Sequence, residues 1–141
     1  WRLNMDKMQC FGTLWGRICL SAIFILAGVG KIFDFQGTAD YMASKGMCMV
    51  PVFLVGAILV EVLGGLSILL GCKARYGAGA LALFLIPVTY IFHNFWTMEP
   101  GMERMIQMQM FLKNLAIYGG LVYVWACGPG SCSCDGRCEK K

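Results

Sequence analysis

The sequence predicts an all-α integral membrane protein, a four-helix bundle whose helices alternate up and down across the bilayer. Of its 141 residues, 58% are hydrophobic and only 14% are charged, whereas soluble domains carry about 25% charged residues. Residues 76–98 and 114–134 contain no charged side chain. About 20 apolar residues cross a bilayer as one helix. A soluble helical bundle is disfavoured because these segments lack a polar face.

Four membrane helices are expected, at residues 12–34, 51–71, 76–97 and 108–127. Pro51 opens the second at a position that helix starts favour. The short connection at residues 71–75 makes the second and third helices an antiparallel hairpin. Pro87 lies inside the third, where a membrane helix tolerates it as a kink. The segment Gly128–Gly130 ends the fourth.

The chain divides into three regions. Residues 1–10 form a short interfacial lead, residues 11–127 the transmembrane domain, and residues 128–141 a polar tail rich in cysteine. Residues 35–50 are expected to be a loop. The sequence begins at Trp1 rather than Met, and we expect a preceding segment, such as a targeting peptide.

The distribution of lysine and arginine predicts the orientation. One side of the membrane holds seven of these residues and the other holds four. Both termini are therefore expected on the positively charged inner face, which is the cytoplasmic side of a bacterial inner membrane or the matrix or stromal side of an organellar one. The formal net charge of +4 is too small to indicate nucleic-acid binding. The seven are Arg2, Lys7, Lys73, Arg75, Arg137, Lys140 and Lys141, and the four are Lys31, Lys45, Arg104 and Lys113.

Polar side chains inside the spans are candidate functional residues, because charge in a membrane is costly and usually faces the bundle interior. Glu61 lies at the middle of the second span and His93 in the outer half of the third. Both are candidates for proton transfer. Five further residues are candidates for binding a cofactor: Arg17, Lys31, Asn94, Lys113 and Asn114.

Each of these residues also has a structural interpretation. Arg17 and Glu61 are expected to form an ion pair that joins the first two spans. Lys31 and Lys113 can extend their amines to the interface. His93 lies beside Phe92 and Phe95 in an aromatic belt of the kind found at membrane surfaces. A single histidine excludes bis-histidine haem ligation, but it leaves a proton carrier or the axial ligand of one pigment open.

The order and spacing of several motifs resemble the DoxX family of small membrane proteins. The resemblance covers residues 11–127 and rests on Gly16-Arg17 and Ala27–Lys31 in the first span, Glu61–Leu66 in the second, His93–Trp96 in the third and Phe111–Leu115 in the fourth. The loop from Asp34 to Gly46 also matches. The tail after Cys127 does not align with the family.

The resemblance implies a four-helix membrane bundle and polar positions at Arg17, Lys31, Glu61, His93, Lys113 and Asn114. Some DoxX-like proteins are linked to quinone-coupled oxidation of sulfur compounds, and others to complexes that answer thiol oxidative stress. Many have no assigned reaction.

The eight cysteines form two groups. The scattered ones are expected to be free, small apolar residues. The tail holds a C-x4-C-x-C-x3-C cluster, which fits zinc poorly and leaves metal binding, disulfides among its four members and free thiols open. A disulfide there would indicate the opposite orientation or an oxidising compartment. The scattered cysteines are Cys10, Cys19, Cys48 and Cys72, and the cluster is Cys127, Cys132, Cys134 and Cys138.

Three functions are weighed. The first is a membrane subunit of a redox system, embedded in the lipid bilayer, with a quinone in the outer half of the bundle and a soluble redox partner, since no complete catalytic constellation lies in this chain. The second is a structural or accessory subunit of a large respiratory or photosynthetic complex, with bound lipid or pigment. The third is transport of a small solute or protons.

Overall fold

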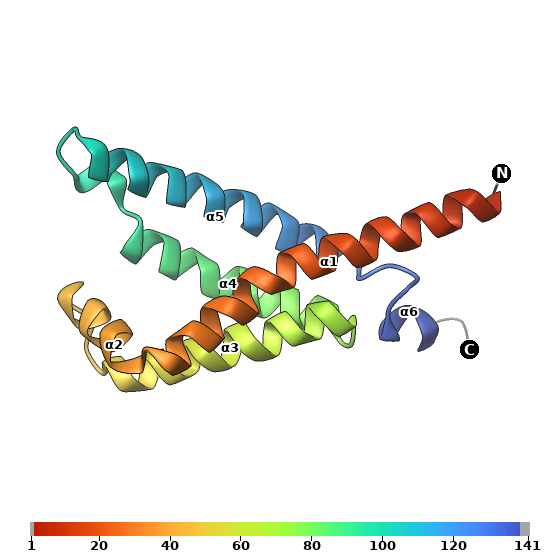
Figure 1. Ribbon diagram of the computed structural model, residues 1–141, viewed down its shortest axis with the longest axis horizontal. Coiled ribbons are helices and arrows are strands. Elements are labelled where there is room, and N and C mark those ends of the chain that lie inside the picture. The colour runs from red at the N-terminus through yellow and green to blue at the C-terminus, as the bar shows by residue number, and fades with distance from the viewer. Residues whose placement is uncertain (1, 139–141) are drawn as a thin grey trace.

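The computed structural model describes residues 2–138 of the chain, with side chains over residues 7–136, and these residues form helices and no strand. Four helices are long: α1 (Arg2–Phe33), α3 (Val50–Leu70), α4 (Ala74–Phe92) and α5 (Met102–Cys127). Three are short: α2 (Phe35–Ser44), the 3₁₀ helix η1 (Phe95–Thr97) and α6 (Cys134–Cys138). Consecutive long helices run in opposite directions (Figure 1), which confirms the predicted all-helical bundle.

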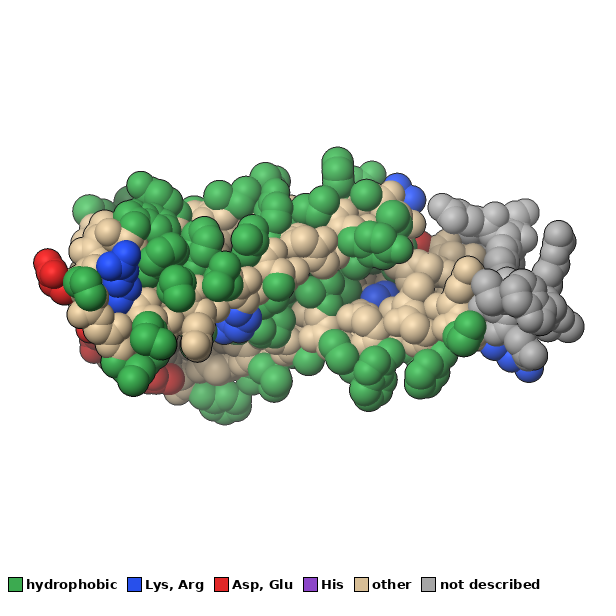
Figure 2. All heavy atoms as spheres, turned by 90° about the horizontal axis from the view of Figure 1, so that it is seen from above, with side chains coloured by type: hydrophobic (Ala, Val, Ile, Leu, Met, Phe, Trp, Pro, Cys, Tyr) green, Lys and Arg blue, Asp and Glu red, His purple; other side chains and the backbone are tan. Residues whose placement is uncertain are grey.

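Four spans are long and apolar enough to cross a membrane: Lys7–Phe33, Val50–Leu70, Ala74–Thr97 and Met102–Cys127. Large hydrophobic side chains lie exposed along them, among them Leu26, Leu63, Leu83 and Tyr123. Figure 2 shows such side chains over the middle of one face, with acidic side chains gathered at one end. This surface suits lipid rather than water, and the chain is an integral membrane protein.

The start of α1 and the short helix α6 lie at one end of the bundle, while α2 and η1 lie at the other (Figure 1). We call these the inner and the outer end. Of the seven lysine and arginine residues of the positively charged side, Lys7, Lys73 and Arg75 lie at the inner end, and Arg2 and Arg137 belong to α1 and α6 there. Lys140 and Lys141, and the side chains of Arg2 and Arg137, lie outside the described residues.

Several helix boundaries differ from the prediction. α1 begins ten residues before the predicted span, because residues 2–11 contain no proline or glycine to stop a helix. The predicted loop contains α2, whose start is capped by Asp34, where Oδ1 accepts a hydrogen bond from the Gly37 amide at 3.3 Å. α5 begins six residues earlier than predicted, and α4 ends at Phe92, with His93 as its C-cap.

The long helices pack mainly in chain order, α1 on α3, α3 on α4 and α4 on α5, while α1 and α5 touch at few points. The core lies where α1, α3, α4 and α5 meet, and Ile68, Leu81 and Leu121 are fully buried there. α2 packs on α3 near the outer end. The bundle is therefore an open row of helices rather than a closed ring.

Two glycines set the register between α1 and α3. A Cβ atom on Gly28 would lie 2.7 Å from Val62 Cγ2 and 3.2 Å from Glu61 Cβ. A Cβ atom on Gly65 would lie 2.7 Å from Ile25 Cγ1. Small residues permit this close approach of membrane helices. The register places Gly28 of α1 opposite Glu61 of α3, and this decides which α1 side chain reaches the carboxylate.

Candidate functional site

An ion pair between Lys31 and Glu61 joins α1 to α3. Glu61 lies in the middle of α3 and only 6% of its surface is exposed. The ammonium Nζ of Lys31, one helical turn beyond Gly28, lies 2.9 Å from Oε1 and 2.8 Å from Oε2 of Glu61. Because both carboxylate oxygens are paired, a charge near the middle of the membrane is compensated within the protein.

The expected ion pair between Arg17 and Glu61 is wrong. Arg17 lies eleven residues before Gly28, a distance of about 16 Å along the helix, so it is far below the carboxylate in this register. It lies instead at the inner end, where its Nη2 donates to the carbonyl oxygen of Cys132 at 2.8 Å. The alternative interpretation, that Lys31 only extends its amine to the membrane surface, is also wrong, because the amine contacts Glu61.

A cavity of about 370 Å³ opens next to this ion pair. Its walls come from α1, α2, α3 and α4, and it lies in the outer half of the bundle. Apolar side chains form most of the wall, and Lys31 and His93 are its basic members. Glu61 contacts Lys31 but does not itself line the cavity. The lining residues are Lys31, Thr38, Tyr41, Met42, Met47, Phe53, Ala57, Phe84, Pro87, Val88, Ile91, Phe92 and His93.

Aromatic and polar contacts hold the outer edge of the cavity in place. The rings of Tyr41 on α2 and Phe92 on α4 stack with their centroids 5.6 Å apart. Nδ1 of His93 lies 2.8 Å from Oε1 of Gln107 on α5, within hydrogen-bond distance. His93 therefore connects the end of α4 to α5, and its ring also faces the cavity.

The other predicted residues lie apart from this cavity. Asn114 is buried and donates from Nδ2 to the hydroxyl of Thr89 at 3.0 Å, which joins α5 to α4. Lys113 is exposed and its Nζ lies 3.2 Å from the sulfur of Met110. Asn94 precedes η1 without a side-chain cap. The structure thus brings together Lys31, Glu61 and His93 of the predicted set.

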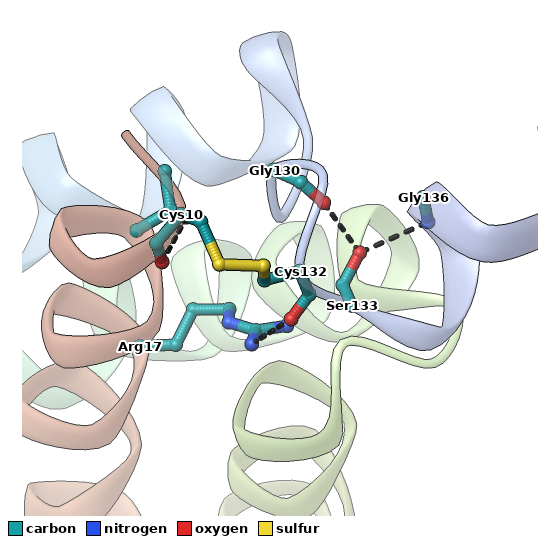
Figure 3. Close-up of a disulfide and its surroundings, with 7 residues drawn as sticks. Cys10, Arg17, Gly130, Cys132, Ser133 and Gly136 are labelled. Carbon is teal, nitrogen blue, oxygen red and sulfur yellow. Dashed lines mark hydrogen bonds between the residues drawn. A yellow bond between two sulfur atoms is a disulfide. The ribbon is translucent and has the colours of Figure 1, made fainter. Parts of the chain in front are cut away.

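The inner end is closed by the tail. Cys10 of α1 and Cys132 form a disulfide with a Cα–Cα distance of 5.3 Å, shown in Figure 3. Ser133 accepts a hydrogen bond from the Gly136 amide and donates one to the carbonyl of Gly130. These contacts fold the tail over the start of α1.

The disulfide corrects the prediction that Cys10 is free. Cys10 was assigned to a separate lead, but α1 continues through it and carries it to the end where the tail begins. A disulfide was one of the alternatives left open for the tail, but only among its own four cysteines, whereas Cys132 pairs with Cys10 outside the cluster. Cys19, Cys48, Cys127 and Cys134 are free thiols, as expected for the first two. The side chain of Cys138 lies outside the described residues.

The guanidinium group of Arg17 lies buried beside the disulfide (Figure 3), with 3% of the residue exposed. Its Nη2 has a partner in the Cys132 carbonyl, but within the described residues its Nε and Nη1 have none. The group lies within electrostatic reach of Cys134 and Asp135. A buried cation thus sits directly under the tail cysteines.

Comparison with known proteins identifies the family. A family model described as DoxX matches residues 12–94, which run from α1 to just beyond α4. The chain belongs to the DoxX family. The match contains Arg17, Lys31, Glu61 and His93, while Lys113 and Asn114 of α5 lie beyond it.

Individual relatives extend the match of this DoxX protein to its whole length. Inner membrane protein YqjF of Escherichia coli K12 is 38% identical over 138 residues, which cover 97% of this chain and 99% of that protein. Inner membrane protein YphA of the same bacterium is 34% identical and covers 86% of each chain. A Surfeit locus protein 4 homolog of Schizosaccharomyces pombe is 34% identical over 60% of this chain and 28% of its own length. No solved structure matches.

Sequence reasoning missed several residues of this DoxX bundle that the cavity uses. Thr38, Tyr41 and Met42 line it from α2, a helix that was expected to be a loop. Gln107, whose Oε1 lies 2.8 Å from Nδ1 of His93, was not among the candidate residues. Asp34 is a residue type that helix N-caps prefer, and this was the signal in the sequence for the start of α2.

Metal binding by the tail cysteines was left open, and the described residues contain no cluster of metal-ligating side chains that supports it. Across residues 7–136, no group of three or more His, Cys, Asp or Glu side chains is placed to hold a metal ion. Of the four cysteines assigned to that site, Cys132 is in the disulfide, and Cys138 lies beyond this range.

Proposed function

We propose that this DoxX-family protein binds a small amphipathic molecule of the quinone class in the cavity next to the Lys31–Glu61 pair, and that it serves as the membrane subunit of a redox system. The observation that carries the proposal is the cavity itself, a mostly apolar space of about 370 Å³ whose basic wall residues are Lys31 and His93. Ligand pockets typically occupy about 300–1,000 Å³ and combine apolar walls with a few placed polar groups.

The chemistry of the wall supports a quinone. A quinone head has an apolar ring and two carbonyl oxygens that accept hydrogen bonds. Lys31 donates from α1 and His93 offers a ring nitrogen from the end of α4, because its Nδ1 is the atom that faces Gln107. Tyr41 and Phe92 supply flat apolar surface between them. The cavity therefore offers donors and a stacking surface of the kinds that this ligand class requires.

Glu61 has a positioning role in this proposal. It holds the Lys31 amine with both oxygens, so the amine keeps one position on the cavity wall. His93 lines the same cavity and is the wall residue assigned to proton transfer in this proposal.

Binding of a short-chain ubiquinone analogue to the protein in lipid nanodiscs tests the proposal. Val88 lines the cavity, and Leu83 lies on the same helix with 72% of its surface exposed. We expect saturable quenching of tryptophan fluorescence in the wild type and in Leu83→Trp, and at least tenfold weaker binding in Val88→Trp. Equal affinity in all three proteins, or no binding above that of empty nanodiscs, would overturn it.

The redox partner is tested separately, by native electrophoresis and mass spectrometry of the protein extracted in mild detergent. We expect a soluble oxidoreductase to co-migrate with it, together with extracted quinone. Co-migration with a large respiratory or photosynthetic complex without quinone would instead make the chain an accessory subunit.

A further inference from the structure

We propose that the Cys10–Cys132 disulfide is a thiol–disulfide exchange site on the inner face of the membrane, and that its substrates are protein dithiols. This activity is separate from the cavity, which lies in the outer half of the bundle. Four features carry it: the side of the membrane on which the disulfide lies, its accessibility, the buried arginine beneath it and the second attachment of the tail.

The first feature is a conflict between location and chemistry. Both cysteines lie at the end of the bundle that holds Lys7, Lys73 and Arg75, and the excess of lysine and arginine in the segments of the sequence assigned to this side marks it as cytoplasmic. Reducing systems on that side keep thiols reduced, and disulfides found there are usually transient, catalytic or redox-sensing. A disulfide in the tail was expected to indicate the opposite orientation or an oxidising compartment, whereas we keep the orientation that the charge bias gives and interpret this disulfide as one that opens and closes rather than as a permanent link.

The second feature is access. Cys10 and Cys132 are both half-buried, and Cys134 is exposed two residues further on. An open hollow of about 690 Å³ lies beside this segment, and Ser131 and Asp135, which flank Cys132, line it. Lys73 and Arg75 line the same hollow. We expect an extended segment of a partner protein to bind in this hollow. Acidic residues in that segment would be favoured, because Lys73 and Arg75 carry positive charge.

The third feature is Arg17, which acts through the cysteines and does not itself react. Its Nη2 holds the carbonyl of Cys132, while its Nε and Nη1 have no partner in the described part of the chain. A donor left unpaired in a buried site costs free energy. A thiolate released from the disulfide is an acceptor that forms beside this cation, and arginine favours the thiolate form of nearby cysteine.

The fourth feature keeps the site together after reduction. The carboxylate of Asp135 accepts hydrogen bonds from the amides of Lys73 at 2.9 Å and Ala74 at 3.0 Å, and its own amide donates to the Gly71 carbonyl at 2.9 Å. The tail therefore stays attached to the turn between α3 and α4 without the disulfide. The two thiols remain close, as a reversible site requires.

The reaction balances as an ordinary exchange. One thiolate of the partner attacks Sγ of Cys132, a mixed disulfide forms and Cys10 leaves as a thiolate that takes up a proton. The second thiolate of the partner then attacks its own sulfur in the mixed disulfide, and Cys132 leaves. Two electrons and two protons pass to the Cys10–Cys132 pair, and the partner leaves as a disulfide.

Exchange is measured on the full-length protein in nanodiscs with reduced thioredoxin as the dithiol probe, followed by trapping with a maleimide–polyethylene glycol reagent. Glutathione at the same thiol concentration is the monothiol control. We expect reduction by the dithiol to be at least tenfold faster. Cys10→Ser and Cys132→Ser identify the gel bands of the reduced and the disulfide-bonded protein. Cys48→Ser, at the outer end, is expected to leave the rate of exchange unchanged.

Two further measurements separate a reactive site from a structural one. An impermeant maleimide should label Cys134 in inside-out vesicles and not in right-side-out spheroplasts. In the reverse reaction, in which the reduced protein attacks oxidised thioredoxin, Arg17→Gln should move the rate–pH profile to higher pH, with Arg17→Lys restoring it, whereas a purely structural role would change the melting temperature without moving the profile. A disulfide that resists the dithiol, or Cys134 labelled from the outside only, would overturn the proposal.

Discussion

The amine of Lys31 on α1 lies 2.8 Å and 2.9 Å from the two carboxylate oxygens of Glu61 on α3. This contact lies one helical turn from Gly28, where the two helices approach closely. The glycine and the ion pair depend on each other, since a wider helix separation would draw the amine away from the carboxylate. The pair therefore links the packing of the membrane core to the wall of the cavity.

Removal of one partner of this pair should destabilise the protein. Breaking a buried ion pair typically costs roughly 3–5 kcal/mol, and because Lys31 is 25% exposed we expect about 2 kcal/mol for Lys31→Met. Glu61→Met alone should cost a comparable amount. The double variant should recover most of the loss, as measured by thermal unfolding in detergent. A double variant with the summed loss of the two single ones would show that the pair is not coupled.

A methyl group at Gly28 should separate α1 from α3. Its Cβ would lie 2.7 Å from Val62 Cγ2, and overpacking of a well-packed site costs about 1–3 kcal/mol. Gly30 is the matched control, because nothing lies within 4 Å of the position of its Cβ. Gly28→Ala should lower the melting temperature, while Gly30→Ala should leave it unchanged or raise it. Equal effects of the two substitutions would argue against the close contact.

The hydrogen bond from Asn114 to Thr89 should couple α5 to α4. Interhelical hydrogen bonds in membranes contribute about 0.6 kcal/mol on average and up to about 1.7 kcal/mol. A double-mutant cycle with Asn114→Leu and Thr89→Val should give a coupling energy in that range. A control cycle with Ser21→Ala and Thr89→Val should give no coupling energy, since the Ser21 hydroxyl donates its hydrogen bond within its own helix. A coupling near zero in the first cycle would contradict the contact.

Loss of the carboxylate at Asp135 should release the start of α4. This side chain caps the amides of Lys73 and Ala74 from a distant part of the sequence, and loss of a helix cap costs about 1 kcal/mol. Asp135→Ala should speed hydrogen exchange of these two amides about fivefold, the factor that follows from that energy. Asp40→Ala, on exposed α2, is the control and should leave them unaffected.

The number, type and order of the membrane helices follow from the sequence, because apolar length alone determines which segments cross a bilayer. The candidate polar residues follow too, since charge inside a membrane is rare enough to be recognised one residue at a time. Lys31, Glu61 and His93 were all selected in this way. Their selection needed no knowledge of how the helices pack.

The partners of these residues could not be predicted in the same way. Which residue pairs with Glu61 depends on the vertical register of α1 and α3, and that register is set by the contacts of Gly28 and Gly65. Several glycines in these helices offered the same close approach, and the sequence does not distinguish between them. The pairing of Cys10 was missed for a related reason, because it required the correct start of α1.

The disulfide also bears on how the protein is made. Cys10 lies near the start of the first of the four candidate spans and Cys132 follows the last, so the two sulfurs meet at one end of the bundle only when the chain has crossed the membrane an even number of times. A chain whose final span has failed to insert places them on opposite sides of the membrane and cannot form the bond. The ability to form this cross-link therefore excludes chains with an odd number of crossings, and a pulse-chase experiment under oxidising conditions separates the two populations.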